Sequence, residues 1–181
     1  MYGIIATWRM ALEGISKADS MLKNNESAAD SIEEAIKAVE DFEYYKSVGY
    51  GGLPNEEMEV ELDAAFMDGD TLEFGCVGGV KDFANPVSIA RSLMHYDANN
   101  FLVGQGAEKY ASRHGFERKT MLTDRAKIHY HNRTKEITNT ELKPYSGHDT
   151  VGMVCLDTAG HMTCATSTYG LFVKHPGGLG D

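Results

Sequence analysis

The sequence predicts an α+β fold in which a layer of helices packs on a β-sheet. A short apolar, β-prone run at Tyr2–Thr7 is followed by two stretches with apolar residues at helical spacing, Met10–Leu22 and the segment from Ser27 to about Asp41. Two later pairs of strand-like runs are each joined by a short polar turn, which predicts two β-hairpins. Two successive helices after a strand are typical of a helical layer on one face of a sheet.

Length and composition indicate a single globular domain. The chain has 181 residues, of which 42% are hydrophobic and 24% charged, so it can bury a substantial core and is not expected to be disordered. The formal net charge of −10 argues against a nucleic-acid or anionic-membrane partner, because such partners require clustered Lys and Arg. Basic residues do gather between Arg113 and Lys127, but acidic residues surround them and a solvated face is expected.

Three cysteines, Cys76, Cys155 and Cys164, lie inside apolar runs and are expected to be buried free thiols. Their odd number and the lack of CxxC spacing predict neither a disulfide framework nor a zinc site. No stretch approaches the ~18 apolar residues of a membrane span. Met1–Ala11 lacks the basic start and long apolar region of a secretory signal, so a cytoplasmic location is expected if Met1 is the true start.

The first half of the chain predicts one strand, two helices and a hairpin. The strand Tyr2–Thr7 is expected to be buried on both faces, and Ser27 is the predicted N-cap of the second helix. The hairpin strands and their turn are Glu59–Met67, Thr71–Val80 and Asp68-Gly69-Asp70. The elements expected next are a helix from Pro86 to about Tyr96, a strand at Asn100–Val103 and a helix at Gly106–His114.

From Lys119 to Gly147 the apolar periodicity disappears. A short helix is expected around Ala126, and Asn132–Gly147 is expected to be an exposed linker. The second hairpin follows, with strands at Val151–Asp157 and Met162–Ser167.

No cofactor or metal is predicted. The glycine-rich loop Ser47–Pro54 lacks both the Lys-Ser/Thr of a P-loop and the spacing of a dinucleotide fingerprint, so a flexible connection is expected. His129 and His131 would share one side of an extended chain and could bind a metal together. No third ligand is evident nearby, and surface histidines are therefore the preferred interpretation.

The junction at Asp149-Thr150 carries the main chemical possibility. The Thr150 hydroxyl can attack the Asp149 carbonyl, which moves the acyl group from nitrogen to oxygen, and hydrolysis of the ester then leaves Thr150 as a new N-terminus. An N-terminal threonine supplies both nucleophile and base, because its α-amine has a pKa of about 8 and accepts the hydroxyl proton near neutrality. The residues by themselves also allow a threonine that simply starts a strand, with its hydroxyl in a turn.

Several segments in a fixed order extend over nearly the whole chain. They are Ala6-Thr7-Trp8, Ser47–Gly52, Leu62-Asp63-Ala64, Met67-Asp68-Gly69, Gly75–Gly78, Leu102-Val103-Gly104, Gly147–Val154, Gly160-His161 and Thr166-Ser167-Thr168. In these segments the chain resembles the glycosylasparaginases, or aspartylglucosaminidases, a family of N-terminal-nucleophile hydrolases.

The resemblance implies roles for individual residues. Thr150 matches the nucleophile, and Thr168 and Ser47 match hydroxyl residues that neighbour it; without the resemblance both would be ordinary strand and loop hydroxyls. Trp8 matches an aromatic residue that packs against the substrate, although a core or interface tryptophan is the alternative. Asp181 matches the residue that holds the substrate ammonium. Gly178 stands where the family has the Arg that binds the substrate carboxylate.

The same resemblance implies a four-layer αββα sandwich. Residues 1–149 would be the α subunit, with the linker at about 132–147, and residues 150–181 would open the catalytic β subunit. Compared with the family, the β subunit is expected to be truncated after Asp181, and the sandwich incomplete without its oxyanion-hole segment. The full-length parent is expected to be a homodimer of αβ units.

The implied reaction is hydrolysis of the amide that joins N-acetylglucosamine to asparagine, after autocleavage between Asp149 and Thr150. No cofactor is implied. The enzymatic alternative is a type-III L-asparaginase or isoaspartyl peptidase, which acts on β-aspartyl substrates. A catalytically inactive relative that acts as a binding protein is the alternative from another class, and Gly178 together with the truncation supports it.

Overall fold

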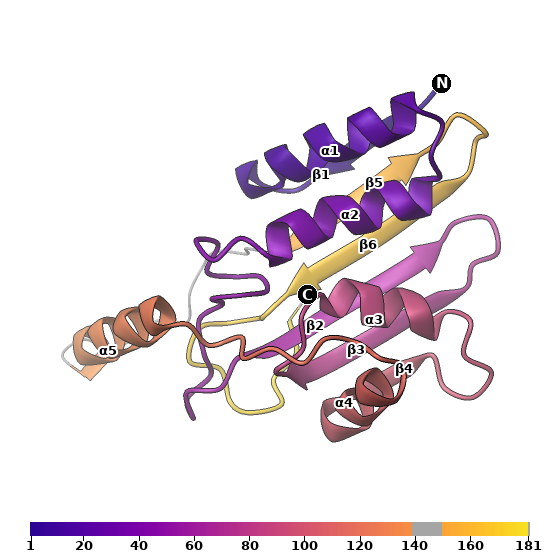
Figure 1. Ribbon diagram of the computed structural model, residues 1–181. Coiled ribbons are helices and arrows are strands. Elements are labelled where there is room, and N and C mark those ends of the chain that lie inside the picture. Colours follow the sequence, from indigo (N-terminus) through magenta and orange to yellow (C-terminus); the bar gives the residue numbers. More distant parts are fainter. Residues whose placement is uncertain (139–149, 181) are drawn as a thin grey trace.

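The computed structural model describes residues 1–138 and 150–180. These residues form one six-stranded sheet with helices on one face (Figure 1). The strand order is β1 (Gly3–Ala6), β5 (Val151–Leu156), β6 (Met162–Thr168), β2 (Glu61–Asp68), β3 (Phe74–Lys81) and β4 (Phe101–Val103). Neighbouring strands are antiparallel except for β3 and β4, which are parallel. The α+β class predicted from the sequence is therefore confirmed.

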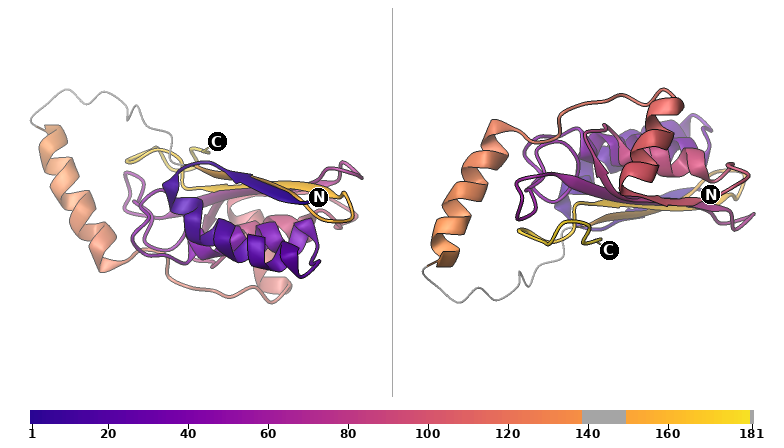
Figure 2. Two further views of the ribbon diagram at one scale, coloured as in Figure 1. Left: turned by 90° about the horizontal axis from the view of Figure 1, so that it is seen from above. Right: turned by 90° about the horizontal axis from the view of Figure 1, so that it is seen from below.

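The helices α1 to α4 pack on the same face of the sheet, whereas α5 projects away from it (Figures 1 and 2). The helical elements are the short 3-10 helix η1 (Arg9–Ala11), α1 (Leu12–Lys23), α2 (Ala28–Glu40), α3 (Pro86–Leu93), α4 (Gly104–Arg113) and α5 (Asp124–Thr138). The main core lies between α1–α4 and the sheet and includes Leu22, Ile36, Phe66, Leu93 and Met153. Burial of such apolar side chains is the main force that holds the layer to the sheet.

Local sequence signals fix the helix ends and the close contacts between layers. Ser27 accepts a hydrogen bond from the Asp30 amide at 3.0 Å, which confirms the predicted N-cap of α2. Gly14 lets α1 approach α2 closely, because a Cβ at this position would lie 2.3 Å from the Ala35 carbonyl oxygen. Both predicted hairpins are present, as β2–β3 and β5–β6.

The opposite face of the sheet is apolar and uncovered by any helix or strand of the described chain (Figure 2). The strand register sets one row of side chains across this face, because directly paired residues point the same way. The row runs through Ile5, Val154, Cys164, Met67 and Phe74. Ile5 is 78% exposed and Val154 44% exposed. We call this surface the open face.

Three predictions about local structure are wrong. The three cysteines were expected to be buried, but Cys76 and Cys164 are partly exposed and Cys155 is buried. The strand Tyr2–Thr7 was predicted to be buried on both faces, but β1 is an edge strand whose Ile5 points onto the open face. The exposed linker was predicted from Asn132, but α5 continues to Thr138. Residues 139–147 of that predicted linker lie outside the described part of the chain.

Candidate active site

Three polar side chains lie side by side on neighbouring strands at one end of the open face. Val151 of β5 pairs with Ser167 of β6, so the antiparallel register one residue further along sets Thr150 opposite Thr168. Thr168 in turn pairs with Asp63 of β2. Because residues opposite each other in a sheet point to the same face, Thr150, Thr168 and Asp63 form a polar row. Thr168 and Asp63 are buried and Thr150 is half-buried.

Thr7 holds the backbone around Thr150 in place. Its Oγ1 donates to the Thr150 carbonyl at 2.7 Å and accepts from the Gly152 amide at 2.9 Å. The Thr7 amide also donates to the Gly152 carbonyl at 2.9 Å. One hydroxyl therefore satisfies backbone groups on both sides of Val151, which fixes the start of β5 against the end of β1. Sequence reasoning placed Thr7 in a matching segment but gave it no role.

Trp8 follows Thr7 directly and is presented to solvent. Its side chain is 55% exposed, and its backbone has a φ of 61°, a left-handed conformation that is uncommon for a bulky residue. This exposure rules out the interpretation of Trp8 as a core tryptophan. An exposed indole beside the residue that fixes Thr150 is available for contact with a ligand or another surface.

Ser47 is buried in the glycine-rich loop and connects it to the strand that bears Thr168. Its carbonyl accepts a hydrogen bond from the Tyr169 amide at 3.0 Å. Further along the loop, Gly49 has a φ of 62°, and a Cβ there would lie 2.1 Å from the Glu40 carbonyl oxygen. The Tyr50 amide donates to that same Glu40 oxygen at 2.7 Å. The loop is thus held to α2 and to the residue after β6 by backbone hydrogen bonds.

The carboxyl group of Glu40 is fully buried behind this region. It accepts hydrogen bonds from the Val87 amide at 3.1 Å and the Asn85 amide group at 3.2 Å, at the start of α3. Burial raises its pKa to about 8, although these hydrogen bonds and the nearby Ser167 hydroxyl act in the opposite direction. Ser167 Oγ is itself buried and, among the described residues, completes no hydrogen bond of good geometry.

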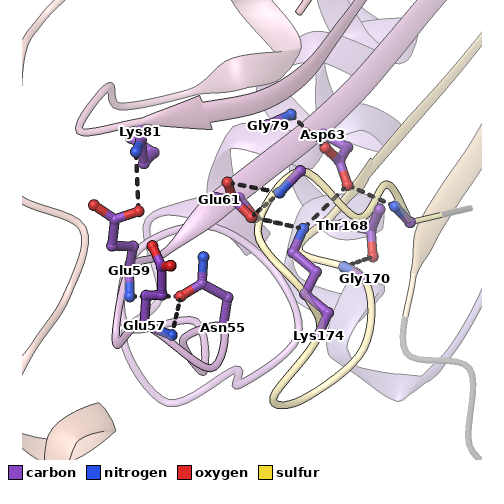
Figure 3. Close-up of polar contacts among 12 residues, drawn as sticks. Asn55, Glu57, Glu59, Glu61, Asp63, Gly79, Lys81, Thr168, Gly170 and Lys174 are labelled. Atoms are coloured by element: carbon purple, nitrogen blue, oxygen red, sulfur yellow. Dashed lines mark hydrogen bonds and ion pairs between the residues drawn. The ribbon is translucent and has the colours of Figure 1, made fainter. Parts of the chain in front are cut away.

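A second buried cluster joins β2 to the last described segment of the chain (Figure 3). Lys174 Nζ lies 3.9 Å from a Glu61 carboxylate oxygen and 3.8 Å from a carboxylate oxygen of Asp63. Burial raises the pKa of Asp63 and lowers that of Lys174, and the attraction between the two charges acts in the opposite direction on each. The cluster also receives backbone donors from Gly177 and Gly180.

Gly178 lies within this segment. A Cβ added at Gly178 would meet the His175 carbonyl oxygen at 3.0 Å and carbon atoms of Lys174 at 3.6 Å. Its φ is outside the left-handed region, so a larger residue is compatible with the backbone after a small shift of the neighbouring carbonyl. The other two predicted site residues, Asp149 and Asp181, lie outside the described residues.

The histidines considered as metal ligands are not placed together. His129 and His131 lie on α5, where residues two apart point to different sides of the helix. In the described ranges, no group of three or more His, Cys, Asp or Glu side chains is arranged to hold a metal ion. Within the same ranges, no helix is both long and apolar enough to cross a membrane.

Comparison with known proteins identifies the family. A family model described as asparaginase matches residues 6–181. The chain is 33% identical over 178 residues to an N(4)-(β-N-acetylglucosaminyl)-L-asparaginase of Elizabethkingia miricola, which covers 98% of this chain and 52% of that protein. It is 36% identical over 176 residues to an isoaspartyl peptidase/L-asparaginase of Rattus norvegicus, with 93% and 53% covered.

A third relative is an isoaspartyl peptidase of Escherichia coli, 32% identical over 176 residues, with 92% of this chain and 54% of that protein covered. The chain thus spans about half the length of the curated relatives it matches. The family match extends across both the strand that begins beside Thr150 and the segment that covers Asp63, and the chain belongs to the asparaginase family of amidohydrolases.

Proposed function

We propose that Thr150 is the nucleophile of an amidohydrolase and is released as an N-terminus by cleavage of the Asp149–Thr150 bond. The observation that carries this proposal is the polar row on the open face. It sets Thr150 beside the buried Thr168, with Thr7 bound to the Thr150 carbonyl and the Ser47 loop bound to the residue after Thr168. If Thr150 only began a strand, its hydroxyl would not need these neighbouring hydroxyl groups.

The cleavage consists of two balanced steps. The Thr150 Oγ attacks the Asp149 carbonyl carbon, the C–N bond breaks, and the hydroxyl proton passes to the Thr150 nitrogen, which leaves an ester and a free amine. Water then hydrolyses the ester and restores the hydroxyl. In this proposal residues 1–149 become the α subunit, and the β subunit begins at Thr150.

The freed amine then serves the hydrolytic reaction. It takes the proton from Thr150 Oγ as the oxygen attacks the amide carbon of the substrate, and it returns a proton to the leaving amine. The resulting ester is hydrolysed by water. Thr168, which lies opposite Thr150, and Ser47 are the hydroxyl groups proposed to orient this amine and hydroxyl.

The substrate is proposed to be an asparagine derivative with its side-chain amide modified. Glycosylated asparagine, cleaved to aspartate and a glycosylamine, is the first candidate, because the Elizabethkingia relative is named for this activity. A β-aspartyl peptide is the second candidate, because the rat and Escherichia coli relatives are named isoaspartyl peptidases. Trp8 and Asp181 are the proposed substrate-binding residues.

The open face supports a further structural part of the proposal. Its apolar row, with Ile5 and Val154 largely exposed, has the composition of a surface that packs against a second sheet. A four-layer αββα sandwich, with one helical layer outside each sheet, would bury it. Homodimers of αβ units are proposed for the assembled enzyme.

Kinetics with matched substrates test the proposed reaction. The 181-residue chain is expected to be a poor hydrolase, so a version extended to the length of its relatives would be assayed on N-acetylglucosaminyl-asparagine and on a β-aspartyl dipeptide, beside the variants Thr150→Ala, Thr150→Ser and Thr158→Ala. We expect Thr150→Ala to abolish turnover, Thr150→Ser to retain part of it, and Thr158→Ala in the hairpin turn to have no effect. Turnover that survives Thr150→Ala would overturn the assignment, and the ratio of kcat/KM values separates the two substrate classes.

Gly178 supports a second candidate function, that of a binding protein without turnover. The family Arg at this position would supply an ion pair to the substrate carboxylate, worth about 1.5–3 kcal/mol, and glycine supplies none. Aspartate binding measured by calorimetry, with no hydrolysis of either substrate, would favour this candidate.

A further inference from the structure

The last described segment of the chain is attached to the open face at the polar row. Gly180 lies against Thr168 so closely that a Cβ at position 180 would be 2.5 Å from Thr168 Cγ2 and 2.8 Å from the Gly170 Cα. Leu179 lies over Gly78 of β3 in the same way, since a Cβ on Gly78 would be 2.6 Å from a Leu179 methyl carbon. The segment Gly177–Gly180, here called the C-terminal segment, therefore covers Thr168 at close contact.

Two carboxylates of β2 hold this segment by its backbone. Both oxygens of Glu61 accept from the Gly177 amide at 3.0 Å, and one oxygen of Asp63 accepts from the Gly180 amide at 2.7 Å. Bonds from an amide to a carboxylate are stronger than bonds between neutral groups. The side chains of Glu61 and Asp63 are 7% and 9% exposed, so water competes weakly for them.

A β-bulge in β3 lies opposite Asp63. Leu62 pairs with Val80 and Ala64 pairs with Val77, so two residues of β3, Gly78 and Gly79, lie opposite the single residue Asp63 of β2. The Asp63 Oδ1 accepts from the Gly79 amide at 2.7 Å, while its Oδ2 takes the Gly180 amide. Bulges are common next to functional sites. Each oxygen of Asp63 thus serves a different N–H, and a carboxamide could replace only one of them.

Lys174 makes the two carboxylates compatible with burial. Its ammonium lies between Glu61 and Asp63 at 3.8–3.9 Å, and its aliphatic chain lies beneath Gly170 and Gly178. A cation between two buried carboxylates offsets their mutual repulsion. The cluster of Glu61, Asp63 and Lys174 therefore fastens the C-terminal segment to β2. Its central residue is Asp63, which pairs with Thr168.

We propose that Asp63 and Glu61 are positioning residues that hold the C-terminal segment against Thr168 and so set the substrate-binding end of the active site. The inference rests on the proposed function, because the C-terminal segment lies against Thr168, the proposed neighbour of the nucleophile, and contains Gly178, the position proposed to lie near the substrate carboxylate. Asp63 acts at the end of the segment nearest Thr168, and Glu61 acts at the Gly177 end. Neither carboxylate needs to touch the substrate.

The test compares Asp63→Asn, Glu61→Gln and the control Glu59→Gln. Glu59 also pairs with a lysine, Lys81 at 2.9 Å, but it is 41% exposed, and its ion pair is with Lys81 of β3 rather than with the C-terminal segment. Hydrogen exchange of the Gly177 and Gly180 amides reports the fastening directly. Substrate KM and the rate of cleavage at Asp149–Thr150 report its consequence, because cleavage of the chain does not require bound substrate.

We expect Asp63→Asn to accelerate Gly180 exchange and raise KM, each by about tenfold or more, since it replaces a charge-assisted bond. Cleavage should remain within about twofold of the parent, whereas a general loss of folding would slow cleavage and accelerate exchange at amides throughout the chain. Glu61→Gln retains one acceptor and should loosen Gly177 alone by a smaller factor. The Glu59→Gln control should change neither exchange nor KM.

Parental exchange at Gly180 in Asp63→Asn, or an unchanged KM, would overturn the proposal. If Asp63→Asn does not fold, Glu61→Gln decides, and parental exchange at Gly177 would then count against it. A parent chain that neither cleaves nor hydrolyses substrate would refute the proposed function, whereas the exchange measurements would still show whether the two carboxylates fasten the segment.

Discussion

The buried carboxyl of Glu40 predicts an unusual dependence of stability on pH. Its ordinary pKa is 4.5, and burial raises the pKa to about 8 in the folded protein. Between these values the folded chain holds a proton on Glu40 that the unfolded chain has released. Because stability falls with pH wherever the folded state binds more protons, the free energy of unfolding should decrease as pH rises from about 4.5 to about 8.

The magnitude follows from the same two pKa values. The interval from 4.5 to about 8, at about 1.4 kcal/mol per pH unit, corresponds to ~5 kcal/mol for Glu40 alone. The substitution Glu40→Gln removes this dependence and leaves a residue of similar shape that is neutral at every pH. The free energy of unfolding of Glu40→Gln minus that of the parent should therefore increase by ~5 kcal/mol between pH 4.5 and pH 8. Altered hydrogen bonds add a difference that does not depend on pH.

Urea unfolding followed by far-UV circular dichroism at half-unit pH steps measures this difference. Glu34→Gln on the same helix is the control of opposite sign, because hydrogen bonds from Lys17 and Lys37 lower the Glu34 pKa. The stability that Glu34 contributes is present above its unfolded pKa and is lost as pH falls. The free energies of unfolding of Glu34→Gln and the parent should therefore lie closer together in acid than at neutral pH. Parallel pH profiles of the parent and Glu40→Gln would refute the account of Glu40.

Three other substitutions follow from single contacts. Gly14→Ala places a methyl group 2.3 Å from the Ala35 carbonyl oxygen and should lower the free energy of unfolding by about 1–3 kcal/mol in a urea titration. Thr7→Val removes the hydroxyl bonded to the Thr150 carbonyl and should slow chain cleavage followed by intact mass, while Thr7→Ser should restore it; equal rates in all three would contradict this role. Gly178→Arg should lower KM by about tenfold or more through a bidentate carboxylate pair, and an unchanged KM would show that the missing cation is not limiting.

Much of the fold was predictable because its signals are local. The Ser27 cap, the Asp68-Gly69-Asp70 turn and the alternation in Val151–Ser167 each depend on residues within a few positions of one another. The second hairpin, predicted from the sequence, also implied that Thr150 and Thr168 lie close together. Local patterns therefore predicted the hairpins, whereas the roles assigned to Thr150 and Thr168 came from the family resemblance.

The features that were missed depend on contacts between distant parts of the chain. The sequence of β1 is equally apolar in a central or an edge strand, and only the sheet order shows that Ile5 faces outward. Helix α5 was missed beyond Ala126 because a helix without an apolar stripe gives no 3.6-residue pattern. Its start is instead fixed by the Thr123 hydroxyl, which accepts from the Ala126 amide at 3.2 Å.

The Asp63 cluster illustrates the same limit at the site. In the sequence, Glu61 and Asp63 are alternate residues of a strand, and Lys174 is a lone base in a glycine-rich stretch. Their association depends on a bulge in β3 opposite Asp63 and on the return of the chain across the open face. A charged pair spaced by two in an otherwise apolar strand was the available signal, because such residues are rarely buried without partners.

The intact mass of the purified chain, taken fresh and after prolonged incubation, tests the central claim that Thr150 becomes an N-terminal nucleophile. The account predicts two fragments that separate between Asp149 and Thr150 in the parent, and an uncut chain in Thr150→Ala. A parent chain that keeps a single uncut mass throughout the incubation would contradict it.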